Sequence, residues 1–149
     1  MKKRRNPFKK YYYLATLILV FCVPTSVAAY ALSDVVKIDE LVPFIVLVTI
    51  IGSIWDVWAT RHGKSDRVWL WQFHPAQTLG YRIFGLPVEE YLFYIASSVY
   101  VIYMWEGMKL MARYGTSEAY IMVFGLGAWS LGAILAPYLF RSKGDRIIN

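Results

Sequence analysis

Cysteine and histidine are scarce in this chain, and their scarcity excludes several kinds of chemistry. Cys22 is the only cysteine among 149 residues, so neither an internal disulfide nor a site of several thiolates can form. The two histidines, His62 and His74, are too few to build a metal site alone. No glycine-rich phosphate loop, dinucleotide fingerprint or nucleophile elbow occurs. We therefore predict that the protein uses neither a metal nor a cofactor.

Charged residues are nearly absent from four long segments, which argues against a soluble helical protein. A soluble helix carries polar residues at helical spacing along its exposed face. The four segments have about 20 residues each, enough to cross about 30 Å of hydrocarbon. They are residues 12–32, 41–59, 87–105 and 119–140. The sequence predicts an all-α integral membrane bundle of about four transmembrane helices, with residues 1–149 as a single membrane domain.

The formal charge of +6 is distributed as in a membrane protein rather than a nucleic-acid-binding protein. Six basic residues precede the first apolar run, within a basic segment at 1–11, and more occupy residues 60–86 and the C-terminal tail. Basic residues collect on the cytoplasmic side of a membrane. We predict a multi-pass protein of the cell's inner (plasma) membrane with its N-terminus and C-terminus cytoplasmic, and no nucleic acid as a partner.

The first apolar run resembles a signal peptide, because it follows a basic start and contains Ala29-Tyr30-Ala31. However, the run is long for a signal core, and its removal would place the basic C-terminal tail outside the cell. We favour an uncleaved helix that anchors the chain or packs. In the fourth run, Ala128, Gly132 and Ala136 recur every four positions, with Gly125 nearby. Such a face lets helices approach closely, either within the chain or against a partner.

Three acidic residues lie at one end of the second and third runs. Asp56 is near the end of the second, and Glu89 and Glu90 follow Pro87 at the start of the third. Since the second run enters the cytoplasmic leaflet and the third leaves from it, the acids should lie at similar depth. Acids at the edge of a bilayer are costly and often functional. The alternatives are helix-start charges, or ion pairs with Arg61 or Arg82.

The segment between these runs is unusually apolar and aromatic. Its tryptophans are typical of the membrane interface. Alternatively, the segment folds back over the acids, with Trp71 and Phe73 facing inward.

Trp71-Gln72-Phe73, Leu79-Gly80 and the stretch from Gly85 to Tyr94, which contains Pro87-Val88-Glu89-Glu90, resemble the lycopene cyclase domain. The similarity covers roughly residues 41–105, which would form the cyclase-like core. In this family two such domains usually work together, as two subunits or one fused chain. Since this chain has one Pro-x-Glu-Glu motif, the resemblance implies a partner: a homologous second subunit or a second copy in a homodimer.

The resemblance implies an acid–base isomerisation of an acyclic carotenoid such as lycopene, dissolved in the lipid bilayer. A proton adds to an end-group double bond, a second double bond captures the cation, and proton loss leaves a β ring. This makes the protein an enzyme of the intramolecular lyase or isomerase type. On one helix Glu89 and Glu90 point about 100° apart. We predict Glu89 as the acid, Glu90 as its modulator or the base, and Asp56 as their partner.

Aromatic faces stabilise a carbocation without attacking it. The residues predicted to bind substrate in this way are Trp55, Trp71, Phe73, Tyr91, Phe93 and Tyr94. Two alternatives remain open: a non-catalytic membrane subunit or scaffold that keeps the cyclase fold, and a carotenoid hydratase-like enzyme, since water would intercept the cation.

Overall fold

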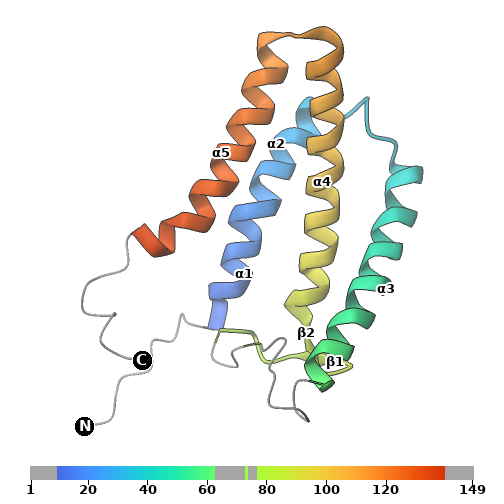
Figure 1. Ribbon diagram of the computed structural model, residues 1–149, viewed down its shortest axis with the longest axis vertical. Helices are drawn as coiled ribbons and strands as arrows, with labels where there is room; N and C mark the ends of the chain where they lie inside the picture. The colour runs from blue at the N-terminus through green and yellow to red at the C-terminus, as the bar shows by residue number, and fades with distance from the viewer. Residues whose placement is uncertain (1–9, 63–72, 74–76, 140–149) are drawn as a thin grey trace.

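The computed structural model describes residues 10–62, 73 and 77–139, and in this part of the chain four helical rods pack side by side (Figure 1). The first rod, called the first helix below, consists of α1 (Tyr12–Leu17), η2 (Ile18–Cys22) and α2 (Val23–Ala31). The other three are α3 (Ile38–His62), α4 (Val88–Tyr114) and α5 (Ser117–Leu139). The all-α bundle predicted from the sequence is confirmed.

Three of these rods are long and apolar enough to cross a membrane, namely Tyr12–Ala31, Ile38–Thr60 and Ser117–Ala136. The remaining helix, α4, has 27 residues and a length of about 40 Å. It is more polar than the others because it begins with two glutamates and contains several tyrosines. That α4 also spans the bilayer stays a prediction, as does the side on which the termini lie.

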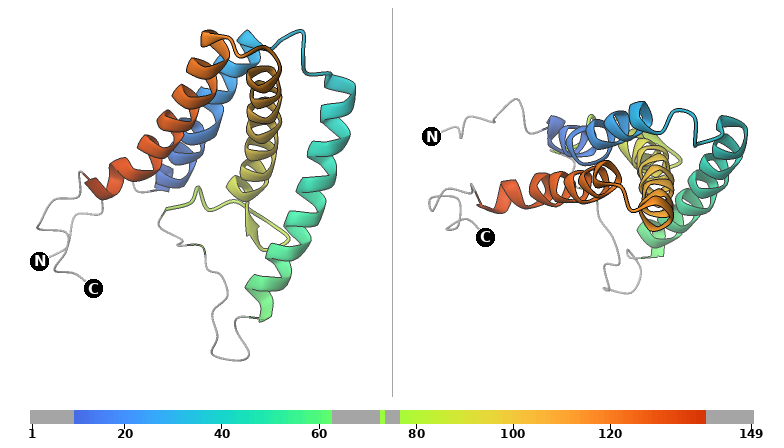
Figure 2. Two further views of the ribbon diagram at one scale, coloured as in Figure 1. Left: turned by 45° about the horizontal axis from the view of Figure 1, so that its top comes forward. Right: turned by 90° about the horizontal axis from the view of Figure 1, so that it is seen from above.

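Short connections at one end of the bundle join the first helix to α3 and α4 to α5. Figures 1 and 2 show α4 between the first helix and α3, and α5 beside the first helix. The turn from α4 to α5 requires Gly115, whose φ of 59° is left-handed and therefore suits a residue without Cβ. The Thr116 hydroxyl then accepts a hydrogen bond from the N–H of Ala119 and caps α5.

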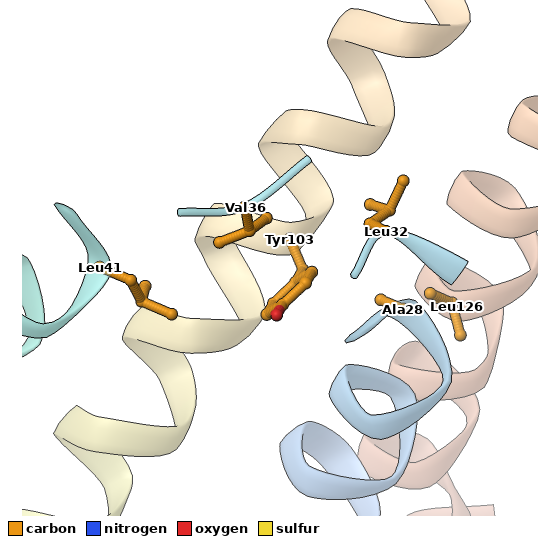
Figure 3. Packing of buried hydrophobic residues seen from close by; sticks show 6 residues of the cluster. All are labelled: Ala28, Leu32, Val36, Leu41, Tyr103 and Leu126. Atoms are coloured by element: carbon orange, nitrogen blue, oxygen red, sulfur yellow. The ribbon is translucent and has the colours of Figure 1, made fainter. Parts of the chain in front are cut away.

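The main apolar core lies near this connected end, where α2, the α2–α3 connection, α4 and α5 meet (Figure 3). Tyr103 of α4 is only 6% exposed and lies between side chains from the neighbouring elements. The other members of the cluster are Ala28, Leu32, Val36, Leu41 and Leu126. The core thus holds the rods together at the end away from the three acids.

A small hairpin lies at the opposite end, beside the end of α3 and the start of α4 (Figure 1). Strand β1 (Arg82–Ile83) pairs antiparallel with β2 (Leu86–Pro87), and α4 begins directly after it. Pro87 has φ −59° and serves as the N-cap of α4, where its missing N–H costs no helical hydrogen bond. The hairpin therefore determines where α4 starts, and with it the position of Glu89 and Glu90.

The two glycines on the small-residue face of α5 do not pack closely against another part of the described chain. A Cβ added at Gly125 or Gly132 would meet no atom within 4 Å. Of the two alternatives for this face, close packing within the chain therefore does not hold at these two glycines. Instead, α5 packs through larger buried residues, including Val123, Leu126 and Ser130.

Candidate active site

A cavity of about 670 Å³ lies among the first helix, α3, α4 and α5, towards the hairpin end of the bundle. Its volume is within the range of about 300–1,000 Å³ that is usual for small-molecule sites. The wall is mostly apolar, and two carboxyl groups, those of Asp56 and Glu90, face into it. The remaining lining residues are Tyr13, Thr16, Leu17, Val20, Phe21, Trp55, Trp58, Ala59, Phe93, Tyr94 and Ile134.

The two carboxyl groups in the cavity are buried and each is held by a tyrosine. Asp56 is 7% exposed and Glu90 is 3% exposed. The Tyr13 hydroxyl donates to Oε2 of Glu90 at 2.6 Å, and the Tyr94 hydroxyl donates to Oδ2 of Asp56 at 2.7 Å. Tyrosine hydroxyls thus stabilise both groups without bringing a positive charge into the site.

Glu90 and Asp56 line the same cavity, and their carboxyl groups interact electrostatically. A hydrogen bond between two carboxyl groups requires a proton on one of them, because an ionised carboxylate only accepts. Burial favours the same state, since two negative charges side by side in an apolar cavity are costly. The pair is therefore suited to hold one transferable proton.

Glu89 has a different environment, although it is the immediate neighbour of Glu90. It is fully buried and does not line the cavity. Its Oε1 accepts a hydrogen bond from the backbone N–H of Leu79, and its Oε2 has no hydrogen-bond partner. The divergence expected for adjacent helix positions thus directs Glu90 into the cavity and Glu89 toward the segment that precedes the hairpin.

That segment connects two helices at the acidic end of the bundle. The carbonyl oxygen of Gln77 accepts from the N–H of Tyr13 at 3.3 Å, and the carbonyl oxygen of Tyr81 accepts from the N–H of Val88 at 3.0 Å. Residues 77–81 therefore join the start of the first helix to the start of α4. Glu89 holds the middle of this segment.

The aromatic residues predicted to bind substrate are divided by the structure. Trp55, Phe93 and Tyr94 line the cavity. Tyr91 lies instead on a separate cavity of about 400 Å³, and its hydroxyl donates to the carbonyl oxygen of Ile83. Phe73 is half-buried but does not line the main cavity, and Trp71 lies outside the described residues.

Of the two predicted ion pairs with arginine, the structure tests only the one with Arg82, and Arg82 does not pair with the acids. Among the described residues, neither glutamate nor Asp56 forms a salt bridge. Arg82 is exposed, and its Nη1 donates to the carbonyl oxygen of Gly85. The side chain of Arg61 lies outside the described residues. The described residues contain no group of three metal-ligating side chains.

The first helix was expected only to anchor or pack, yet it forms one wall of the cavity. It contributes Tyr13, which bonds to Glu90, and Phe21, whose ring meets that of Phe93 edge-on at 5.7 Å. One signal was available in the sequence: tyrosine is polar enough to hydrogen-bond at an interface. However, Tyr11, Tyr12 and Tyr13 are adjacent, and nothing local distinguishes the one that faces the acids.

Comparison with known families agrees with this geometry. A sequence model described as lycopene cyclase matches residues 9–108, which is more than half of the chain. The chain belongs to the lycopene cyclase family. The match extends from the first helix through the acids into the second half of α4, and so includes every described lining residue except Ile134 of α5. Searches of curated proteins and of solved structures found no match.

Compared with the resemblance noted over residues 41–105, the family match also covers the first helix. This agrees with the structure, in which that helix supplies Tyr13 and Phe21 to the cavity.

Proposed function

We propose that this protein catalyses acid–base cyclisation of an acyclic carotenoid end group to a β ring, as one subunit of a lycopene cyclase. The observation that carries the proposal is the buried Glu90–Asp56 carboxyl pair, which faces an apolar cavity lined by aromatic rings. An apolar end group can enter such a cavity from the bilayer, since Trp55 and Trp58 on its wall are 62% and 43% exposed.

The first step is protonation of the terminal double bond by the protonated member of the pair. We assign this role to Glu90, because its carboxyl group lines the cavity together with that of Asp56. Its Oε2 accepts a hydrogen bond from the Tyr13 hydroxyl. When the proton leaves, the new carboxylate keeps the hydrogen bond from Tyr13, and this bond favours the charged form. General acid catalysis by a positioned group contributes about 10²–10⁴-fold in rate.

The tertiary cation is then captured by a second double bond, and the new carbon–carbon bond closes a six-membered ring. A ring carbon next to the cationic carbon then loses a proton to a carboxylate, and the ring double bond forms. The reaction is complete without net oxidation. Asp56 or the deprotonated Glu90 accepts this proton, since both face the cavity. The rings of Trp55, Phe93 and Phe21 stabilise the cation, by about 0.5–2 kcal/mol for each well-placed face.

Glu89 is assigned a supporting role, which differs from the role predicted from the sequence. It accepts from Leu79 and does not line the cavity, so it holds residues 77–81 against the start of α4. Through these residues it also steadies Tyr13, whose N–H donates to Gln77. We therefore propose Glu90 as the acid, Asp56 as its proton partner, and Glu89 as the residue that maintains their surroundings.

We further propose that the chain acts as a multi-pass protein of the cell's inner membrane together with a homologous subunit or a second copy of itself. Its single Pro-x-Glu-Glu motif and the two-domain organisation implied by the resemblance support a partner. The first helix is expected to remain in the mature protein, because Tyr13 and Phe21 belong to the cavity wall. Both termini would lie on the cytoplasmic side.

The test is expression in a host that accumulates lycopene, alone and with homologous cyclase subunits, followed by chromatography of the carotenoids. β-Carotene or a one-ring product is expected in at least one combination, and Glu90→Gln should remove it. Unchanged lycopene in every combination, with the protein present in the membrane, would refute the cyclase assignment. A hydroxylated acyclic product would instead identify a hydratase.

A further inference from the structure

The first helix contains an irregular turn whose cause is visible in the sequence. Pro24 has no backbone N–H, and its ring would collide with the carbonyl group of Val20 in a regular α-helix. Around residues 18–22 the helix widens into the π-helical turn η2, in which the N–H of Val23 bonds to the carbonyl of Ile18. Turns of this kind are frequent at functional sites.

This widening leaves two backbone carbonyl groups without their usual donors. The α-helical donor of Leu19 is the N–H of Val23, which is already bonded to Ile18, and its π-helical donor would be Pro24. For Val20 the α-helical donor would again be Pro24. An unpaired carbonyl group in an apolar environment is strongly destabilising.

Two consecutive side chains of α5 supply the missing donors. The indole Nε1 of Trp129 donates to the carbonyl oxygen of Leu19 at 2.8 Å, and the Ser130 hydroxyl donates to that of Val20 at 2.9 Å. Ser130 is 7% exposed, so its bond is shielded from competition. These two bonds fix α5 against the irregular turn across 110 residues of sequence.

The irregular turn also forms part of the cavity wall. Leu17, Val20 and Phe21 line the cavity, and the ring of Phe21 packs edge-on against Tyr100 at 5.6 Å. Ser130 hydrogen-bonds with the Tyr100 hydroxyl at 3.2 Å as well as with Val20. Ser130 therefore contacts the carbonyl group of Val20, which precedes Phe21 in the chain, and the hydroxyl of Tyr100, whose ring packs against Phe21.

We infer that Trp129 and Ser130 are positioning residues for the substrate cavity: they hold the turn that Pro24 creates and so place Phe21 against the carotenoid end group. This inference rests on the proposed function for its substrate. Without the two donors, the turn rearranges to find other partners, and the conformation that fits the end group is less populated. Apparent affinity falls by the same fraction.

The main experiment compares the Trp129→Phe/Ser130→Ala double variant with the unaltered protein in lipid nanodiscs, with the partner subunit if cyclisation requires one. Each lost hydrogen bond corresponds to about a twofold to tenfold effect. We expect the KM for lycopene to rise about fivefold to thirtyfold, with a smaller change in kcat. Ser26→Ala is the matched control, because it removes a hydroxyl-to-carbonyl bond within the first helix without reaching α5.

A second variant separates positioning from a general loss of stability. Pro24→Ala restores the N–H at position 24, which can bond to Val20 or Leu19 within the helix. Ser130→Ala should therefore raise KM in the Pro24 protein and have little further effect in the Pro24→Ala protein. Equal fold-changes in both backgrounds would overturn the inference, as would a Ser130→Ala protein that melts earlier but keeps its KM.

The link between Pro24 and Ser130 can also be measured without conversion of lycopene. Thermal unfolding in detergent measures the coupling between positions 24 and 130 without substrate. The four proteins compared are the unaltered protein, Pro24→Ala, Ser130→Ala and the Pro24→Ala/Ser130→Ala double variant. Non-additive unfolding temperatures would support the link between Pro24 and Ser130 while the cyclase assignment fails. Additive temperatures would refute the link itself.

Discussion

The hydroxyl oxygen of Tyr13 lies 2.6 Å from Oε2 of Glu90, although the two residues are 77 positions apart in the sequence. This hydrogen bond joins the start of the first helix to the start of α4 inside an apolar cavity. Tyr94 makes the equivalent bond to Asp56 at 2.7 Å. Each carboxyl group of the site thus has one tyrosine donor, and no described lysine or arginine forms a salt bridge with either group.

Tyr13→Phe should slow cyclisation about tenfold or more while leaving the protein folded. The substitution keeps the ring and removes a hydrogen bond to a group that becomes charged, worth about 1.5–3 kcal/mol. Product formation in membranes or nanodiscs measures the effect. The control is Tyr12→Phe, at a neighbouring residue that is 48% exposed and does not line the cavity. Equal rates for the two variants would contradict the assignment.

Glu90→Gln and Glu89→Gln should differ although the residues are adjacent. Glutamine cannot supply the proton, so Glu90→Gln should reduce the rate at least about 100-fold. At position 89, glutamine retains an oxygen that can accept from Leu79, and a smaller loss, about tenfold or less, is expected. Initial rates of cyclisation, normalised to the amount of folded protein, measure the difference between the two variants. If Glu89→Gln reduced the rate more than Glu90→Gln, Glu89 would be the acid, as predicted from the sequence.

Gly52→Ala should destabilise the protein and disturb Asp56. A Cβ at Gly52 would overlap the ring of Tyr94, whose hydroxyl is 3.1 Å from the Gly52 carbonyl oxygen. Overpacking of this kind costs about 1–3 kcal/mol. The unfolding temperature in detergent should fall, together with activity. Gly127→Ala is the control, since a Cβ there meets nothing within 4 Å and a helix favours alanine.

Trp55→Leu should lower kcat about twofold to thirtyfold, the range expected for the loss of one cation–π contact. Leucine keeps the wall apolar but has no ring to stabilise the cation. Trp105→Leu serves as the comparison, because Trp105 is similarly exposed and lies on α4 away from the cavity lining. An unchanged kcat in Trp55→Leu would remove this residue from the proposed machinery.

The position of the three acids could be predicted from the sequence, but not which of them face the cavity. The lengths of the apolar runs and the alternation of direction placed Asp56, Glu89 and Glu90 at one end, because both are properties of local stretches of chain. Helix periodicity also showed that Glu89 and Glu90 point apart. Which of them faces the cavity depends on the rotation of α4 about its axis, and this rotation is set by packing between α3 and α4, where Tyr94 fills the space left by Gly52.

The aromatic residues illustrate where sequence reasoning fails. Phe93, Tyr94 and Tyr91 lie within one turn of a helix, and all three satisfied the same chemical argument. The structure directs Phe93 and Tyr94 to one cavity and Tyr91 to another. Tyr13 and Phe21 were not predicted because the first helix has no polar pattern that indicates its inner face.

By itself, the sequence determined that this is a helical membrane protein with acidic residues collected near one end of two of its helices, and the turn at Pro24 follows from a missing N–H. These features depend on composition, on helix period and on the chemistry of single residues. The tertiary structure alone decided that Glu90 lines the same cavity as Asp56 and that Tyr13 donates to Glu90. It also decided that Trp129 and Ser130 donate to the carbonyl groups of Leu19 and Val20. Each of these contacts joins segments far apart in the chain, and helix packing selects the side chains that meet.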